Sequence, residues 1–299
     1  MSKEPEKQWN GKSRGGRFGY LFFIYSIRFL GIRFAYAILA FIVVYFIAFA
    51  PKATAAIWRY NRRIRRLGRC RSAAELYRHY YVFGQTLIDR LAFRGGLADR
   101  YRFEFDNYGR FLEIIDSAGG VVMIGAHTGC WEAGAGFFGK YGKKINIVMF
   151  DDEHSGIKEA VDDNASTAGD YKIIAVNRDP LEAMLSMKIA LNNGEYLCFN
   201  GDRWIDEKST AGRIFMGYAA RFPSGPFLLA AKCRVPVVFY YAMRESGRRY
   251  RFIFREAEAC GDSVRLMEEY TASLEDIAKR YPCQWFNFYD FWDYNKQTI

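Results

Sequence analysis

The sequence predicts an α/β fold: a layered domain with a mostly parallel central sheet and flanking helices, preceded by an N-terminal membrane helix or hairpin. Two observations lead to this prediction. Short apolar runs alternate with helical segments over residues 72–299, and one long apolar run lies near the N-terminus. The 299-residue chain is 51% hydrophobic, enough for a large core, and its net charge of +10 favours a polyanionic partner.

Residues 1–71 are expected to anchor the protein to a membrane. Phe34–Ala50 is an unbroken run of apolar and tyrosine residues closed by Pro51, and as a helix it would span about 26 Å of a hydrocarbon core of roughly 30 Å. Arg28 and Arg33 precede it, so a spanning helix with a snorkelling arginine and a hairpin lying in one leaflet both stay open. The alternatives are a cleaved signal peptide, for which the run is long, and a buried core helix.

A basic cluster follows the apolar run. Its members are Arg59, Arg62, Arg63, Arg65, Arg66, Arg69 and Arg71. Each basic residue near an anionic leaflet contributes about 1 kcal/mol of attraction. By the positive-inside tendency, the cluster places the following domain on the cytoplasmic side of the inner membrane. A solvated basic face or a nucleic-acid patch is the alternative, but no nucleic-acid recognition module accompanies the cluster, and no nucleic-acid partner is expected.

Residues 72–299 are expected to form one catalytic domain. Ser72-Ala-Ala-Glu75 has the pattern of a capping box, which predicts a helix from Ser72 to about Phe93. Strands are predicted at Val121–Ala126, Ile145–Phe150, Ile173–Val176, Glu195–Asn200, Val235–Met243 and Tyr250–Glu256. Helices are predicted near 131–141, after His154, from Pro180 to Asn193, at Phe227–Lys232 and at Ser263–Arg280. The short connection between the last two strands predicts a hairpin at one side of the sheet.

His127 is the candidate catalytic residue. It directly follows the buried strand Val121–Ala126, and α/β proteins place their chemistry at the carboxyl ends of such strands. A histidine there can act as a general base if an acid fixes its second ring nitrogen, and Glu132 stands five positions on. His154 has a glutamate at the same spacing but lies in a polar stretch. At His79 the fifth position is Gly84, so that histidine is rejected.

Two later segments add candidate substrate contacts. The strand Glu195–Asn200 leads into Gly201-Asp202-Arg203, which places a carboxylate and a guanidinium at its carboxyl end. Residues 215–226 are expected to form a loop shaped by glycine and proline that leads into the helix Phe227–Lys232. Such a loop can offer backbone N–H groups and a helix N-terminus to an oxyanion or a phosphate, and backbone donors near Gly129 are the other candidate oxyanion site.

At this point the sequence resembles the membrane-bound lysophospholipid and glycerolipid acyltransferases, and within them the late lipid A acyltransferases. His127 and Glu132 match the H-x4-[D/E] catalytic motif of that superfamily. Three later blocks also match, namely Gly201-Asp202-Arg203, Phe222-Pro223-Ser224-Gly225-Pro226 and Tyr281-Pro-Cys-Gln-Trp285. The resemblance implies an acyl carrier protein or coenzyme A thioester as donor, a lipid as acceptor, and no cofactor. It implies substrate contacts at Asp202, Arg203, Arg221, Pro223, Ser224 and Gly225.

The chain departs from the resemblance at two places that bear on the acceptor. Ser224 stands where glycerolipid enzymes often carry glutamate, and residues 286–292 lack the basic residues that often close lipid A enzymes. The expected acceptor is therefore a lipid A precursor, a lysophospholipid, or an amino-acid or polyene lipid.

Other classes of function fit less well. A lipid hydrolase with a serine nucleophile would carry a G-x-S-x-G elbow directly after a buried strand, and Ser224 does not fit it because Phe222 occupies the place of the first glycine. Cys130 beside His127 is flanked by apolar residues, which is typical of packing rather than of a nucleophile. Three dispersed histidines show no metal-ligand spacing, so no metal is expected. A non-catalytic, membrane-tethered protein that binds anionic lipid would explain the anchor and the charge but not the ordered motifs.

Overall fold

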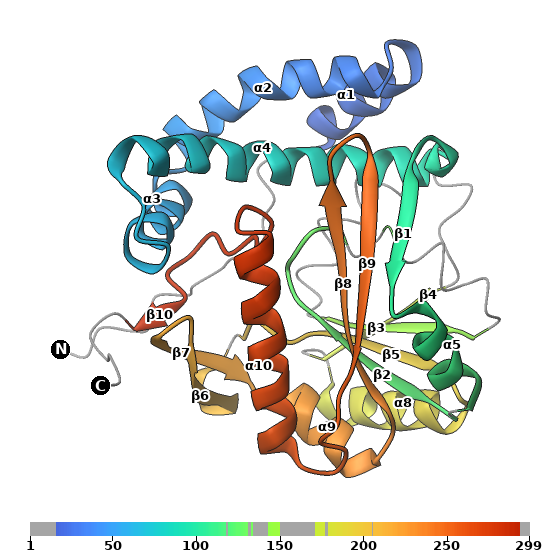
Figure 1. Ribbon diagram of the computed structural model, residues 1–299. Coiled ribbons are helices and arrows are strands. Elements are labelled where there is room, and N and C mark those ends of the chain that lie inside the picture. Colours follow the sequence, from blue (N-terminus) through green and yellow to red (C-terminus); the bar gives the residue numbers. More distant parts are fainter. Residues whose placement is uncertain are drawn as a thin grey trace.

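A computed structural model describes residues 16–117, 119–130, 133, 143–149, 171–176, 179–204 and 206–293 (Figure 1). Its centre is a seven-stranded sheet in the order β1-β9-β8-β2-β5-β3-β4, in which the β8–β9 pair alone is antiparallel. The strands are β1 (Arg102–Asp106), β2 (Val121–Gly125), β3 (Ile145–Met149), β4 (Tyr171–Ala175), β5 (Tyr196–Asn200), β8 (Val237–Glu245) and β9 (Arg249–Glu256). The predicted α/β class and mostly parallel sheet are confirmed.

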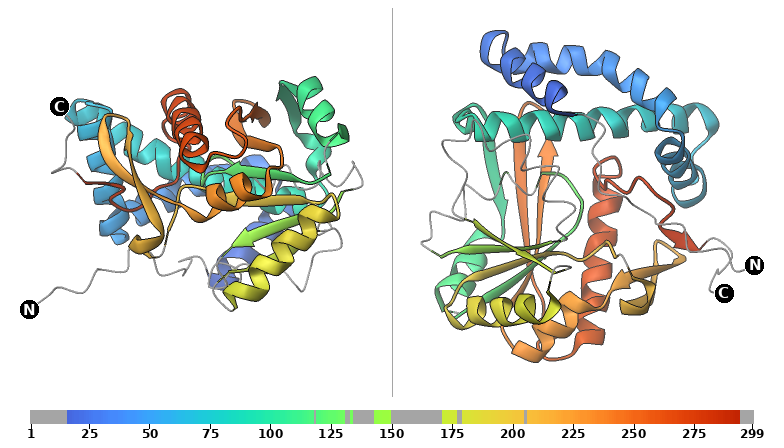
Figure 2. Two further views of the ribbon diagram at one scale, coloured as in Figure 1. Left: turned by 90° about the horizontal axis from the view of Figure 1, so that it is seen from below. Right: turned by 180° about the vertical axis from the view of Figure 1, so that it is seen from behind.

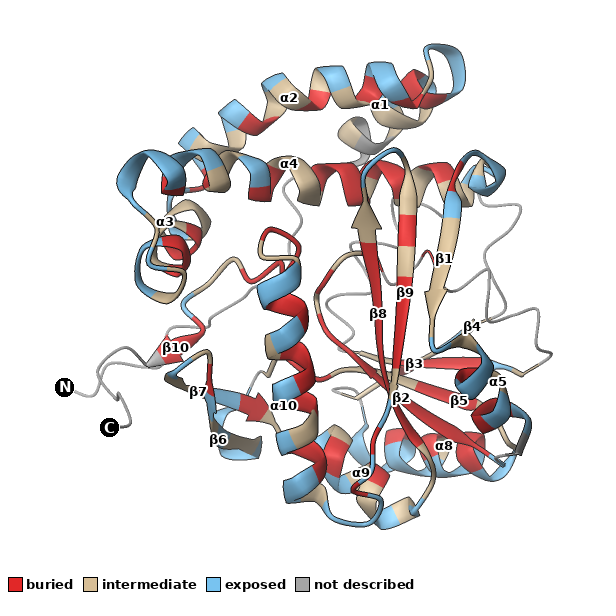
Figure 3. Cartoon of the chain, viewed as in Figure 1, coloured by how far each residue is buried: buried red, intermediate tan, exposed pale blue. Residues whose placement is uncertain are grey.

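Helices cover both faces of this sheet, which explains why its central strands are apolar throughout. Val122 and Ile124 of β2 belong to the core beneath α8 (Pro180–Asn192), α9 (Gly225–Cys233) and α10 (Ser263–Arg280). Val121 and Met123 belong to the opposite core, which is covered by α4 (Arg69–Arg94) and α5 (Tyr108–Ser117). Figure 3 shows the buried residues concentrated in the sheet and on the inward helix faces.

Local capping fixes the start of two of these helices. Asp179 accepts hydrogen bonds from the backbone N–H groups of Leu181 and Glu182, and Pro180 occupies the first helical position of α8. Asp262 caps α10 in the same way through Val264 and Arg265. The predicted starts at Pro180 and Ser263 are confirmed.

A second, three-stranded sheet lies beside α10 and contains β6 (Thr210–Phe215), β7 (Tyr218–Pro223) and β10 (Trp292–Asp293). The prediction that residues 215–226 form a loop is therefore wrong over 218–223. These residues pair in register with β6, from Phe215 opposite Tyr218 to Thr210 opposite Pro223. The tight turn between the strands is made by Met216 and Gly217, both with positive φ.

The N-terminal part forms a helical hairpin of α1 (Gly16–Phe29) and α2 (Ile32–Phe49), turned at Gly31 with φ +85°. Pro51 opens α3 (Pro51–Arg59), which continues into a short π-helical turn at Tyr60–Ile64. The hairpin lies along the side of α4 that faces away from the sheet, as Figure 1 and the right-hand view of Figure 2 show. Within the described part of the chain, α2 alone is long and apolar enough to cross a membrane, with a mean hydropathy of 2.3.

Three further differences separate prediction and structure. Ser72 does not cap α4, which begins at Arg69 after Gly68; the Ser72 hydroxyl is inside the helix and donates to the carbonyl of Leu67 at 3.4 Å. The edge strand β1 was not predicted, and it extends the sheet beyond the β8–β9 hairpin, which is therefore not at the sheet's side. The helices predicted at 131–141 and after His154 lie outside the described residues, apart from Ala133.

Candidate active site

The register of two neighbouring strands brings His127 and Asp202 together. β2 and β5 are adjacent and parallel, and their last residues, Gly125 and Asn200, face each other. His127 and Asp202 each stand two residues beyond these strand ends. Nδ1 of His127 lies 2.7 Å from Oδ1 of Asp202. The site thus lies at the carboxyl edge of the sheet, where His127 was predicted to be.

Asp202 is fully buried and receives several hydrogen bonds from the same neighbourhood. The backbone N–H of His127 donates to both carboxylate oxygens, at 3.1 and 3.0 Å, and Nε1 of Trp285 donates to Oδ2 at 3.1 Å. Burial alone would raise the pKa of this carboxyl, but the imidazole of His127 and the guanidinium of Arg203 lower the pKa below its ordinary value. Asp202 is therefore an ionised acceptor, which places the proton of a neutral His127 on Nδ1.

The backbone around His127 is held as firmly as its side chain. Phe286 donates its N–H to the carbonyl of His127 at 2.8 Å, and Gly129 donates to the carbonyl of Gln284 at 2.9 Å. Gly129 has φ +52°, and a Cβ there would lie 2.0 Å from the carbonyl oxygen of Ala242. Because the Gly129 N–H is already donated within the protein, the suggestion that it serves an oxyanion is not supported by this geometry.

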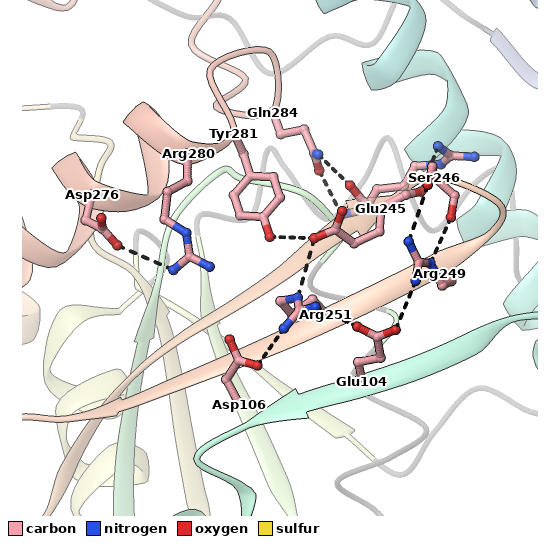
Figure 4. Close-up of polar contacts among 11 residues, drawn as sticks. Glu104, Asp106, Glu245, Ser246, Arg249, Arg251, Asp276, Arg280, Tyr281 and Gln284 are labelled. Carbon is pink, nitrogen blue, oxygen red and sulfur yellow. Dashed lines mark hydrogen bonds and ion pairs between the residues drawn. The ribbon is translucent and has the colours of Figure 1, made fainter.

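The segment that follows α10 carries Trp285 and Phe286, and side chains tie it to the main sheet. Gln284 accepts from the N–H of Arg244 at 2.8 Å and donates to the carbonyl of the same residue at 2.7 Å. The Tyr281 hydroxyl donates to Glu245 at 2.6 Å, and Glu245 pairs with Arg251 at 3.4 Å (Figure 4). Strands β8 and β9 therefore position the residues that hold His127.

Arg203 is close to this pair, as predicted. It is half-buried, and its Nη2 donates to the carbonyl of Phe286 at 2.8 Å. Tyr289 also reaches the region, because its hydroxyl lies 3.5 Å from the backbone carbonyl of Asp202. A guanidinium next to the imidazole supplies positive charge where a substrate phosphate could bind.

The other predicted substrate contacts lie on the small sheet and at the start of α9. Arg221 is exposed on β7, pairs with Glu207 at 3.0 Å and donates to the hydroxyl of Thr210 at 3.3 Å. Pro223 ends β7, and Ser224 precedes Gly225 at the start of α9, with the Ser224 N–H donating to the carbonyl of Ser209 at 2.9 Å.

This region connects to the active site through packed aromatic rings. Phe222 contacts Phe291 at a ring distance of 5.3 Å, and Phe291 contacts Trp285 at 4.9 Å.

Glu132 and the other two histidines, His79 and His154, were also considered from the sequence. Glu132 and His154 lie outside the described residues, so the role of Glu132 stays a prediction. His79 is buried in α4 between Phe286 and Phe288, and burial lowers its pKa to about 3, which keeps it neutral. The rejection of His79 therefore agrees with its packing.

The aspartate–histidine pair has the arrangement that a general base requires. The carboxylate fixes the imidazole so that Nε2 carries the lone pair, and the His127 side chain is 19% exposed. No group of three metal-binding side chains occurs among the described residues. Trp285, Phe286, Phe291 and Trp292 of the aromatic C-terminal segment are all buried. The part of Trp285 in holding Asp202 was missed.

The chain matches a known protein family over nearly its whole length. A family model described as bacterial lipid A biosynthesis acyltransferase matches residues 6–293, which include His127, Asp202 and Trp285. No curated protein matches the chain. Because the match covers nearly the whole sequence, the chain belongs to the bacterial lipid A biosynthesis acyltransferase family and is an acyltransferase that acts on a lipid.

Proposed function

We propose that this enzyme moves a fatty acyl group from an acyl carrier protein or coenzyme A thioester to a hydroxyl or amine of an envelope lipid, with His127 as the general base. The observation that carries the proposal is the 2.7 Å contact between Nδ1 of His127 and Asp202 at the ends of adjacent parallel strands. The acceptor is a lipid A precursor or another lipid of the bacterial envelope, and the reaction takes place at the cytoplasmic face of the inner membrane.

The chemistry balances without a covalent enzyme intermediate, because a thioester is already activated. Nε2 of His127 removes the proton from the acceptor as its oxygen or nitrogen attacks the thioester carbonyl carbon. The new C–O or C–N bond forms, the C–S bond breaks, and the imidazolium returns its proton to the leaving thiolate. The ionised Asp202 stabilises the imidazolium between these two steps.

The substrate contacts are assigned from charge and position. Arg203, beside the catalytic pair, binds phosphate on the donor or acceptor, and Arg221 with Pro223, Ser224 and Gly225 contacts the acceptor from the small sheet. Glu132 supports the imidazole in the proposal. It is the second candidate for orienting His127, on the ground of its place in the H-x4-[D/E] motif.

The test is acyl transfer by His127→Ala in membranes supplied with acyl thioester and candidate lipids. Loss of a general base lowers turnover by at least about 100-fold, and we expect an unchanged melting temperature. His154→Ala is the matched control, because His154 has a glutamate at the same spacing but follows the polar run Asp151-Asp152-Glu153 instead of an apolar strand. Near-normal transfer by His127→Ala would refute the proposal, as would equal losses in both variants. Thioester hydrolysis without transfer would instead indicate a hydrolase.

A further inference from the structure

Helix α2 is packed along its length on α4. Ile32, Ala35, Leu39 and Val43, spaced at helical intervals, are its buried residues and form one face. Gly84 of α4 permits the closest approach, because a Cβ there would lie 2.4 Å from Cδ1 of Leu39. The two helices lie side by side in Figure 1 and in the right-hand view of Figure 2.

Polar contacts add to this packing in the middle of α2. The Tyr36 hydroxyl donates to Asp89 of α4, and the hydroxyls of Tyr77 and Tyr81 donate to backbone carbonyls of Ala40 and Tyr36, at 3.0 and 3.3 Å. Asp89 is fully buried and is also bound by Arg244 of the main sheet at 3.0 Å. Removing α2 from α4 would take a partner from a buried carboxylate, which is costly. The helix is therefore fixed to the catalytic domain.

The outward face of the hairpin is apolar and exposed. Only 22% of Ile32–Phe49 is buried, which excludes a core helix. The exposed large apolar residues are Phe22, Tyr25 and Phe29 on α1, Leu30 in the turn, and Phe34, Phe41, Val44, Tyr45 and Phe49 on α2. Exposed basic residues flank this surface, with Arg28 and Arg33 at the turn and Lys52, Arg62, Arg63 and Arg66 beyond α2. An apolar surface with a basic margin suits an anionic bilayer.

A membrane-spanning α2 conflicts with this packing. Lipid surrounds a spanning helix, but the inner face of α2 contacts α4, which carries exposed charges such as Arg78, with 68% of its side chain exposed. Crossing the bilayer would bring α4 into the hydrocarbon, at about 2.5–3.5 kcal/mol for each central charge.

We propose that the α1–α2 hairpin, which we call the docking hairpin, lies in the plane of one leaflet of an anionic bilayer and does not cross it. The proposal rests on the lipid-directed function above and specifies how the enzyme meets its substrate. Both ends of the hairpin then stay on the catalytic side of the membrane. Phe286 contacts His79 of α4 and binds the His127 carbonyl, so the docking hairpin sets the depth of the active site relative to the leaflet.

Topology gives the first test, with the full chain carrying a tag at each end. We expect protease to remove both tags from inside-out inner-membrane vesicles and neither tag from intact spheroplasts. Protection of the N-terminal tag alone in inside-out vesicles would mean that α2 spans the membrane and would overturn the proposal. Neither result depends on catalysis, so a failure here is distinguishable from a failure of the proposed function.

Vesicle binding gives the second test, using purified protein and phosphatidylglycerol vesicles. The double substitution Phe41→Asp and Phe49→Asp changes two exposed side chains, and we expect binding to fall at least about 10-fold. Leu181→Asp with Leu185→Asp on α8 is the matched control, because this exposed apolar pair lies away from the hairpin; binding should be unchanged. Acyl transfer to a detergent-dispersed acceptor should survive in both.

Two results would contradict the docking hairpin in this second test. Equal losses of vesicle binding in the two double variants would show that exposed apolar residues on α8 bind vesicles as well as those on the hairpin do. The Phe41→Asp and Phe49→Asp variant could also bind vesicles normally but be a monomer by light scattering where the unsubstituted protein is a dimer. That result would mean that a second copy of the chain covers this surface.

Discussion

Asp202 and Asp89 are both fully buried carboxylates, and each gathers donors from distant parts of the chain, yet their partners differ. Asp202 holds an imidazole, a group that can accept a proton and give it back. Asp89 holds the guanidinium of Arg244, which stays charged, and the hydroxyls of Tyr101 and Tyr250 at 2.7 and 2.5 Å. A buried carboxylate thus supports proton transfer in the function proposed for the first site, and at the second it fixes elements to one another.

The groups around Asp89 differ from an imidazole in that they keep their protons. Burial and the nearby Asp89 carboxylate raise the pKa of Tyr250 far above its ordinary value, so its hydroxyl keeps its proton as a permanent donor. Arg244 likewise keeps a raised pKa: burial opposes its charge, but Asp89 favours it. Tyr250 and Arg244 thus stay protonated hydrogen-bond donors to Asp89. Substitutions at the two aspartates should separate activity from stability.

Asp202→Asn should give the largest effect, on turnover. The three N–H groups that surround Asp202 all need an acceptor, and the amide offers one oxygen, so Nδ1 of His127 loses its ionised acceptor and the tautomer changes. We expect acyl transfer to fall by about 1,000-fold, roughly 4 kcal/mol of transition-state stabilisation. Single-turnover kinetics would measure this.

The control for that substitution is Asp290→Asn. It removes an exposed carboxylate that pairs with Arg59 at 2.6 Å and lies in the C-terminal segment that also carries Trp285. It should leave turnover within about twofold. If Asp202→Asn kept normal turnover while Glu132→Gln lost it, the glutamate rather than the aspartate would be the residue that orients His127.

Asp89→Asn should give the next largest effect, on stability. The substitution leaves the buried charge of Arg244 without its counter-ion, and breaking such a pair costs about 3 kcal/mol or more. Chemical denaturation monitored by tryptophan fluorescence would show a lower midpoint, with turnover of the folded fraction retained. Asp106→Asn, at a half-buried ion pair in which Arg251 keeps Glu104 and Glu245 as partners, should cost less than about 1 kcal/mol. Equal costs would mean that the Asp89 cluster does not fix the elements around it.

Trp285→Phe tests a smaller contribution to the catalytic pair. It removes one N–H donor from Asp202 and should lower turnover about tenfold, near 1.4 kcal/mol. Trp292→Phe is a matched control in the same aromatic cluster, because its Nε1 donates to the carbonyl of Phe215 at 2.9 Å instead. Both variants lose similar packing, so a shared loss of turnover would assign the effect to the core rather than to Asp202.

The sequence pointed to the individual residues of the candidate site, but not to the contacts that join His127, Asp202 and Trp285. His127 was found because its signal is local, an apolar strand followed directly by a polar turn. Asp202 was found as a residue but assigned to substrate, because β2 and β5 are neighbours only after β3 and β4 have been placed outside β5. A signal existed, since both residues follow a buried strand at the same distance. Trp285 gave no such signal, because a buried aromatic residue in an aromatic tail is ordinarily packing.

In the fold, too, features that depend on short segments could be predicted, and features that depend on long-range contacts could not. The alternation of strands and helices predicted the class and most of the sheet, because periodicity is a property of short segments. The edge strand β1 was missed although its sequence, Arg-Phe-Glu-Phe-Asp, alternates as a strand with one exposed face does. The choice between a spanning helix and a hairpin was left open, because it depends on long-range contacts such as that of Tyr36 with Asp89.

Arg221→Ala should give the smallest effect and tests how far the substrate site extends from the catalytic pair. Arg221 is exposed and already paired with Glu207, and surface pairs of this kind contribute up to about 1 kcal/mol. We expect the KM for the lipid acceptor to rise about threefold with kcat unchanged, since the residue lies across an aromatic layer from His127. Arg203→Ala, beside the pair, should raise KM about tenfold or more. If Arg221→Ala left KM unaltered while Arg203→Ala raised it, acceptor binding would be confined to the edge of the main sheet and the small sheet would have no part in it.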